Sequence, residues 1–379
     1  MLLTRNIKID GTGGGDEKVG GRIVVFQWNQ QINQGIHEYI RNGYGQFENV
    51  EFKGMGQYGY TNFDDLRAQI LFWGVDGTEL SEEIEGVPTI IRAESYVKGC
   101  SFHNGYHTAI AAMMDSDNIV IDGNSIMGCV DDGIRTDSKG LQITNNIIGN
   151  IHMVQMWHGA TANQVNSNFE EDQLPACINT GETDDVLITG NRCTGSDGGC
   201  FEGRGEACDA SEACSGSLGS SSWTGNQGHS CTVGYFNIKY KQDNKCMKIA
   251  NFYFYKIAYY GYGGIHQGDH TIIENSIIVD AKIGFFNVDT VPGDRKTNTI
   301  KSSYIGGRSD NYDCSYDSSV WNSLELSKFA GSLKPPGKVK GAFYEFIGIE
   351  KLLILYFLFQ YIKFNNLFLL NICLSSTLN

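Results

Sequence analysis

Short β-rich runs closed by turn residues recur along the chain, and no segment has the apolar spacing of a long amphipathic helix. Three runs share one pattern: apolar, any residue, apolar, two turn formers, Asn, any residue, and a residue able to face inward. These runs are Ile119–Ile126, Leu141–Ile148 and Val186–Cys193. A fourth run around Val97 fits the same pattern, with Ser101 and Phe102 at the last two places.

The spacing of these runs predicts a solenoid. Val97, Ile121, Ile143 and Ile188 hold equivalent places, 24, 22 and 45 residues apart, and we interpret the last gap as two coils. A period of roughly 20–30 residues without a helical segment is typical of stacked β coils. We therefore predict an all-β fold, a right-handed parallel β-helix over residues 1–330. Asn at the turn position of each run is expected to stack into a side-chain hydrogen-bond ladder, which would comprise Asn124, Asn146 and Asn191.

Two segments depart from the period. Residues 193–232 are rich in Gly, Ser and Cys, which predicts a disulfide-bearing loop insertion. After an expected linker at 331–350, residues 351–374 are mostly apolar and long enough for a transmembrane segment. Polar residues interrupt that stretch, however, and a misread intron or reading frame produces the same composition. Both interpretations of this tail remain open.

Cysteine usage favours disulfides over a metal site. Six of the 11 cysteines fall within a short region, and no pair of them has the two-residue gap of a zinc knuckle or redox motif. An oxidising compartment is the expected setting for such a region. The first 20 residues contain no apolar signal segment, so we expect the chain to begin inside a longer protein. The disulfide candidates are Cys193, Cys200, Cys208, Cys214, Cys231 and Cys246.

Charge and composition exclude several classes of protein. The formal net charge is −14 and no Lys/Arg cluster is present, which argues against nucleic acid or an anionic membrane surface as a partner. Glycine is abundant at 47 residues but proline numbers only 5, which excludes collagen. Cations and neutral or basic partners remain open.

Residues one period apart should lie above one another, which brings together a possible chemical site. The step from His107 leads to Asp131 and Asp132, and the next step leads to a position beside His152. This stripe, with Arg135, makes catalytic candidates of His107, Asp131, Asp132 and Arg135, acting as acid and base on a saccharide. Asp131, Asp132 and His152 are also metal-ligand candidates, with Ca²⁺ the cation considered and no other cofactor expected. The competing interpretation is that the acidic pair is simply a solvated turn.

Aromatic residues crowd positions 252–262. Exposed aromatic rings on a solenoid face can stack on sugar rings. Alternation along a strand, however, predicts that about half of these rings are buried and fill the core.

Several segments resemble the fibrocystin family in chain order. Leu2–Ile7 is similar to the segment after the eight-glycine domain of that family, and Tyr96–His103 resembles its first clear β-helix coil. Asp132–Arg135, Gly205–Cys208 and Ile300–Ser303 resemble later coils, so the resemblance covers roughly residues 2–315. It implies a fragment of a large extracellular, membrane-anchored protein. The expected role is a cell-surface or ciliary scaffold for adhesion or for glycan or protein binding, without catalysis. A purely structural coat protein without a ligand is hard to separate from that role.

The same domain pair resembles, more distantly, the cell-migration-inducing hyaluronan-degrading proteins. That resemblance implies the alternative function, a polysaccharide-degrading lyase or hydrolase that uses the Asp/His stripe. The sequence departs from the fibrocystin-like pattern at His107, where a small residue is expected, and at Asp131–Asp132, which replaces a Gly-Glu type pair. The stripe is therefore particular to this chain rather than a family site.

Overall fold

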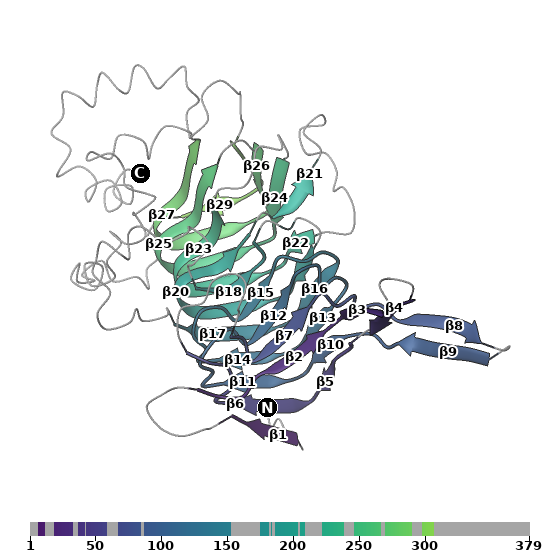
Figure 1. Cartoon of the computed structure of the whole chain (residues 1–379). Coiled ribbons are helices and arrows are strands. Elements are labelled where there is room, and N and C mark those ends of the chain that lie inside the picture. Colours follow the sequence, from purple (N-terminus) through teal and green to yellow (C-terminus); the bar gives the residue numbers. More distant parts are fainter. Residues whose placement is uncertain are drawn as a thin grey trace, which may run out of the picture.

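The chain folds into a solenoid of stacked β coils (Figure 1). The computed structural model describes residues 7–11, 19–32, 37–41, 43–58, 67–84, 87–152, 175–181, 183, 186–203, 205–208, 222–238, 246–266, 270–289 and 298–306. All regular elements within these ranges are strands, so the predicted all-β class is confirmed. Nowhere in the described ranges is there a helix that is long and apolar enough to cross a membrane.

One side of each coil contributes a strand to a ten-stranded sheet, which we call the first row. Successive strands pair in parallel, and only β21 (Glu206–Cys208) runs antiparallel, beside β24. The parallel strands are β5 (Gln46–Glu48), β10 (Tyr96–Lys98), β13 (Val120–Asp122), β16 (Leu141–Thr144), β19 (Val186–Thr189), β22 (Ser222–Thr224), β24 (Cys246–Ala250), β26 (His270–Glu274) and β28 (Asn298–Lys301).

The other two sides of the coils form one fifteen-stranded sheet. The second row contains β1 (Ile7–Asp10), β6 (Val50–Lys53), β11 (Ser101–His103), β14 (Ser125–Met127) and β17 (Ile147–Ile151), and the third row contains β2 (Ile23–Phe26), β7 (Ile70–Trp73), β12 (Ile110–Met113), β15 (Ile134–Thr136) and β18 (Ala176–Asn179). Towards the C-terminal end, long strands run through both rows: β20 (Arg192–Glu202), β23 (Gln227–Ile238), β25 (Tyr253–His266) and β27 (Ile277–Asp289). The short strand β29 (Tyr304–Ile305) pairs with the second-row part of β27.

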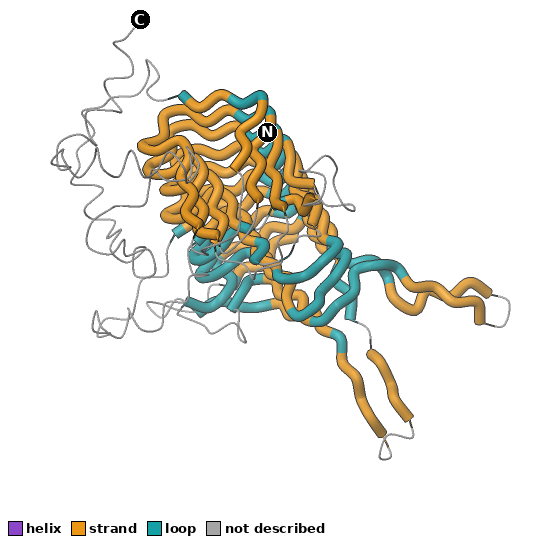
Figure 2. Tube along the Cα trace, turned by 90° about the horizontal axis from the view of Figure 1, so that it is seen from above, coloured by secondary structure: helices purple, strands orange, loops and turns teal. Residues whose placement is uncertain are grey.

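Two hairpins project from the solenoid in Figure 2. They are formed by β3 (Trp28–Ile32) with β4 (His37–Arg41) and by β8 (Leu80–Ile84) with β9 (Val87–Arg92), each an antiparallel pair. Both lie on the connection that leads from the third row to the first row of the next coil.

Equivalent residues of successive coils stack in the core, as the sequence period predicts. Val97 is in register with Ile121, Ile121 with Ile143 and Ile143 with Ile188, and all four are fully buried. The 45-residue step is therefore one coil, and its interpretation as two coils is wrong. The extra length lies between β17 and β18, where the connection enlarges a single coil without adding a strand to the first row.

Buried asparagines connect the coils at the turn after the first row, as predicted. The Nδ2 of Asn124 donates to Asn146 Oδ1, that of Asn146 to Asn191 Oδ1 and that of Asn191 to Asn226 Oδ1, each at 3.0 Å. Each of these oxygens also accepts the backbone N–H of the asparagine one coil before it. Asn226 is an addition to the three asparagines predicted. In the coils after Asn226, Ser276 Oγ accepts the backbone N–H of Phe252, so a serine hydroxyl takes the accepting role that an asparagine amide has in the earlier coils.

The Gly/Ser/Cys-rich insertion is narrower than the predicted range of 193–232. Residues 192–202 form β20 and 227–238 form β23, so the solenoid continues through both ends of that region. Its small residues are explained in part by packing: a Cβ added at Gly228 would lie 2.7 Å from Cys200 Sγ. Residues 209–221, the expected linker at 331–350 and the candidate transmembrane segment at 351–374 lie outside the described residues.

We predict that Asn146→Ala lowers the free energy of unfolding by about 2–4 kcal/mol, because it leaves buried donors of Asn124 and the carbonyl of Ile121 without partners. Urea denaturation of the full chain, followed by circular dichroism, measures the change. Gln142→Ala, on the exposed face of β16 just before Asn146, is the control and should change the value by less than about 0.5 kcal/mol. Equal effects of the two substitutions would contradict a stabilising role for the ladder.

Candidate functional site

Four of the residues singled out from the sequence meet between the second and third rows. Asp131 has a φ of 73° in the turn after β14, and His107 lies at the equivalent turn one coil earlier. His107 Nδ1 is 3.7 Å from Asp131 Oδ2, the same oxygen that accepts a 2.9 Å hydrogen bond from Thr108 Oγ1. The one-period step therefore brings His107 and Asp131 together. Thr108 was not anticipated, although it follows His107 directly in sequence.

Arg135 holds the two carboxyl groups of this cluster. Its NH1 lies 3.5 Å from Asp132 Oδ2 and 3.9 Å from Asp131 Oδ2. The other oxygen of Asp132 accepts a 2.7 Å hydrogen bond from the backbone N–H of Ala176 at the start of β18. The cluster, which we call the Asp/His cluster, thus comprises His107, Asp131, Asp132 and Arg135 and links three successive coils.

Burial dominates the electrostatics of the Asp/His cluster. Asp132 is 0% exposed and His107 2% exposed. Desolvation, followed by the neighbouring Asp131, raises the pKa of Asp132 well above its usual value, and Arg135 opposes that rise. Burial also lowers the pKa of His107, although Asp131 acts in the opposite direction. A neutral imidazole and a carboxyl group that resists ionisation are the forms that the site favours.

The chemistry open to this cluster is limited by access. A carboxyl of raised pKa beside a carboxylate can serve as a general acid, but only where the reacting atom comes within hydrogen-bond distance. Asp131 is the more exposed of the two aspartates, and only 9% of its surface is accessible to solvent. The arrangement is that of a buried polar network joining adjacent coils, and catalysis by these residues stays a prediction.

His152 lies apart from the Asp/His cluster. Its backbone carbonyl accepts the N–H of Asp131, so the backbone register matches the period. Its side chain is half exposed and its Nδ1 lies 3.6 Å from Asp197 Oδ2 instead. The three proposed cation ligands Asp131, Asp132 and His152 therefore do not converge in this structure, and a Ca²⁺ site there stays a prediction.

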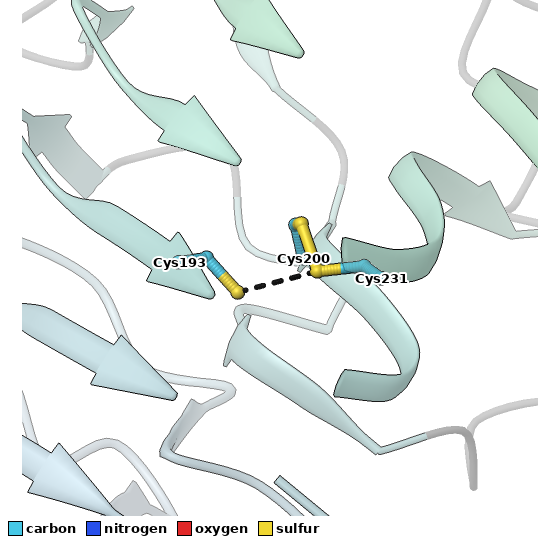
Figure 3. A group of neighbouring side chains, drawn as sticks. All are labelled: Cys193, Cys200 and Cys231. Carbon is cyan, nitrogen blue, oxygen red and sulfur yellow. Dashed lines mark hydrogen bonds between the residues drawn. A yellow bond between two sulfur atoms is a disulfide. The ribbon is translucent and has the colours of Figure 1, made fainter. Parts of the chain in front are cut away.

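The cysteines of β20 and β23 form a sulfur-rich cluster in the core (Figure 3). Cys200 is bonded to Cys231, and Cys193 is bonded to Cys177, a partner that the sequence interpretation missed. Cys193 Sγ lies 3.5 Å from Cys231 Sγ. Three of these sulfur atoms lie close enough for one metal ion, but disulfide bonding removes the thiolates that would ligate it.

Two further disulfide candidates lie opposite each other in the backbone. Cys208 of β21 and Cys246 of β24 are directly paired in the only antiparallel register of the first row that the structure describes. Directly opposed residues in such a pair have Cα atoms about 4.5–5.5 Å apart, within the range of disulfides. The remaining candidate, Cys214, lies outside the described residues.

The outer side of the second row carries a second feature, an exposed set of rings and aliphatic groups near the C-terminal coils. Gln227, Tyr253, Ile277 and Tyr304 form one outward column, and His229, Tyr255 and Val279 form the next. Tyr253 is 38% exposed, Ile277 44% and Tyr304 62%. Phe252, Phe254 and Tyr262 face inward and are buried, as the expected alternation requires. We call the set His229, Tyr253, Tyr255, Ile277, Val279 and Tyr304 the aromatic face.

Comparisons with known proteins agree with the fold and the resemblance. The family described as right handed beta helix region matches residues 34–192. Human Fibrocystin-L is 26% identical over 83% of this chain, mouse Fibrocystin-L 27% over 88%, and dog Fibrocystin 24% over 83%. The chain is similar to the fibrocystins over most of its length. No solved structure matches it.

The chain spans only about 7% of the length of the human and mouse relatives. The right-handed β-helix accounts for the described residues, and this fold fits an extracellular receptor-like module. The family match ends at residue 192, whereas the parallel strands continue beyond it to β29.

The raised pKa of Asp132 makes a prediction about stability and pH. Above its usual value of 3.8, the unfolded chain loses a proton that the folded chain keeps, so the contribution of Asp132 to stability falls as pH rises. Asp132→Asn cannot ionise and can still accept the N–H of Ala176. The free energy of unfolding of this variant, minus that of the wild type, should therefore rise between pH 4 and pH 7. Urea titrations at several pH values measure this difference, and the exposed Asp115→Asn variant is the control. A difference that falls with pH would show an ionised, stabilising carboxylate.

The register of β21 and β24 predicts a disulfide between Cys208 and Cys246. Proteolysis of the full chain without reduction should release one peptide pair linked through these residues, which mass spectrometry identifies. Cys208→Ser should then expose one new thiol that Cys246→Ser removes in the double variant. Alkylation of both cysteines in the unreduced wild type would contradict the prediction.

Proposed function

We propose that this chain belongs to the β-helix module of a large cell-surface or ciliary protein and acts as a rigid scaffold for adhesion, binding a glycan or a protein. In this proposal the module is not catalytic. The single observation that carries it is the contrast between the two candidate sites: the aromatic face is exposed and the Asp/His cluster is buried.

Rigidity supports a scaffold role. The asparagine ladder, the continuous apolar core and two disulfides join successive coils by hydrogen bonds, packing and covalent bonds. Residues on the outer side of such a solenoid keep their relative positions, and a binding surface made from them loses little entropy when a ligand binds.

The state of the Asp/His cluster supports a role without catalysis. Arg135 contacts both carboxyl groups, and the backbone N–H of Ala176 occupies one oxygen of Asp132. Both carboxyl groups therefore have an ionic partner within the fold, while His107 Nδ1 and Asp132 Oδ2 are buried without a hydrogen bond, and the cluster offers a substrate little accessible surface. The same contacts give the Asp/His cluster a structural role, as a polar network between coils.

The disulfides support an extracellular location, because such bonds persist in oxidising compartments. Membrane attachment would belong to the full-length protein, and the segment at 351–374 is a candidate anchor within this chain.

The proposal predicts binding without cleavage. Full chain secreted from cultured cells and labelled with biotin should bind to intact cells, and incubation with polysaccharides should leave their length unchanged by size-exclusion chromatography. Asp132→Asn should bind as the wild type does, provided that its circular dichroism spectrum is unchanged.

Shortening of a polysaccharide by the wild type and not by Asp132→Asn would establish the alternative, a glycan-degrading enzyme that uses the Asp/His cluster. Absence of binding to cells, to glycans and to extracellular proteins would favour a coat role without a ligand and would refute the proposal.

A further inference from the structure

The aromatic face has the regular spacing of the solenoid. Tyr253, Ile277 and Tyr304 occupy the same outward column of three adjacent strands, β25, β27 and β29. Adjacent strands lie about 4.8 Å apart, so the first and last of these rings are separated by about 10 Å along the solenoid axis. The second column adds Tyr255 beside Tyr253. The result is a row that runs across the strands, with Ile277 between the rings of Tyr253 and Tyr304.

Three of the rings, those of His229, Tyr253 and Tyr255, are in contact with one another before any ligand binds. Tyr255 stacks on Tyr253 with ring centroids 5.1 Å apart and on His229 with centroids 4.6 Å apart. Tyrosine also places a hydroxyl group at the rim of an apolar ring, which suits a ligand that has both C–H faces and hydroxyl groups.

Charge on this side of the solenoid differs from that of the whole chain. From β11 to β29, neither outward column contains an aspartate or glutamate among the residues that the structure describes, although the net charge of the chain is −14. Arg192 occupies the same column as Tyr253, two strands away, and is exposed. Lys256 follows Tyr255, is exposed and lies close enough to affect the pKa of His229. Neither Arg192 nor Lys256 makes an ion pair within the described part of the chain.

We propose that the aromatic face binds a linear acidic glycan that lies along the solenoid axis, with its pyranose rings stacked on Tyr253 and Tyr304 and its acid groups near Arg192 and Lys256. This inference rests on the proposed function and specifies its ligand. A neutral glycan would use the rings alone. A protein partner or a second copy of the chain would be expected to bury a wider apolar area than this narrow row of rings provides.

Isothermal titration calorimetry tests the proposal by measuring the affinity of the full chain for two hexasaccharides. One is β-1,4-linked mannuronate, with a carboxylate on each sugar, and the other is the neutral cellohexaose. Mannuronate should bind more tightly, and added salt should weaken its binding selectively. Tyr253→Ala/Tyr304→Ala should weaken both interactions about tenfold or more. Arg192→Gln should weaken only the binding of mannuronate.

Tyr44→Ala is the matched control, since Tyr44 is 53% exposed outside the aromatic face and its loss should change neither affinity. Unchanged affinity in the Tyr253→Ala/Tyr304→Ala variant would overturn the location, and tighter binding of cellohexaose would overturn the acidic class. If neither glycan binds while the chain still binds intact cells, the ligand class fails and the proposed function survives. If the chain binds neither glycans nor cells, both fail.

Discussion

Parallel pairing places each side chain of one coil over the equivalent side chain of the next, and this constraint decides which residues the fold tolerates at each position. Where the same residue type recurs at equivalent positions of successive coils, its side chains must be able to contact one another. Aliphatic residues satisfy that requirement in the core, as the column from Val97 to Ile188 shows. Asparagine satisfies it at a buried turn, because one side chain both donates and accepts and therefore pairs with its own copy above and below. A carboxylate cannot do so, since it only accepts.

The Asp/His cluster follows from the same constraint. Two adjacent carboxyl groups placed at a buried turn repel each other and lose hydration, which raises the pKa of Asp132. The compensation comes from residues that can donate: Arg135 on the following strand, Thr108 one coil before and the N–H of Ala176 one coil after. A set of residues that looks catalytic in sequence is thus also the set required to bury an acidic pair between coils. Accessibility, rather than residue type, separates the two roles.

The sequence predicted what depends on local pattern and failed where distant segments or side-chain direction decide. The column through Val97, Ile121 and Ile143 and the asparagine ladder repeat a short motif, so they could be found by spacing. The step from Ile143 to Ile188 gave the wrong number of coils, because the length of a connection does not reveal whether it adds a strand. His152 occupies the predicted register by its backbone, but its side chain points to Asp197. Cys177 was missed as a disulfide partner because it lies outside the cysteine-rich region. Asn226 was missed as a member of the ladder because it lies within that region, which was interpreted as a loop.

The outer side of the coils is subject to the same stacking without the requirement for burial, and recognition can therefore evolve there at little cost to the fold. Replacing an inward residue such as Phe254 removes ring contacts with Phe252 and with Phe201 of another coil, whereas replacing outward Tyr253 or Ile277 changes mainly the surface. A column of outward residues also places side chains at a regular strand spacing, which matches ligands that are themselves repetitive. Polymers with a regular repeat are consequently the partners that a solenoid surface of this kind is best suited to bind. The two columns contain no carboxylate among the described residues from β11 to β29, which extends that fit to acidic polymers.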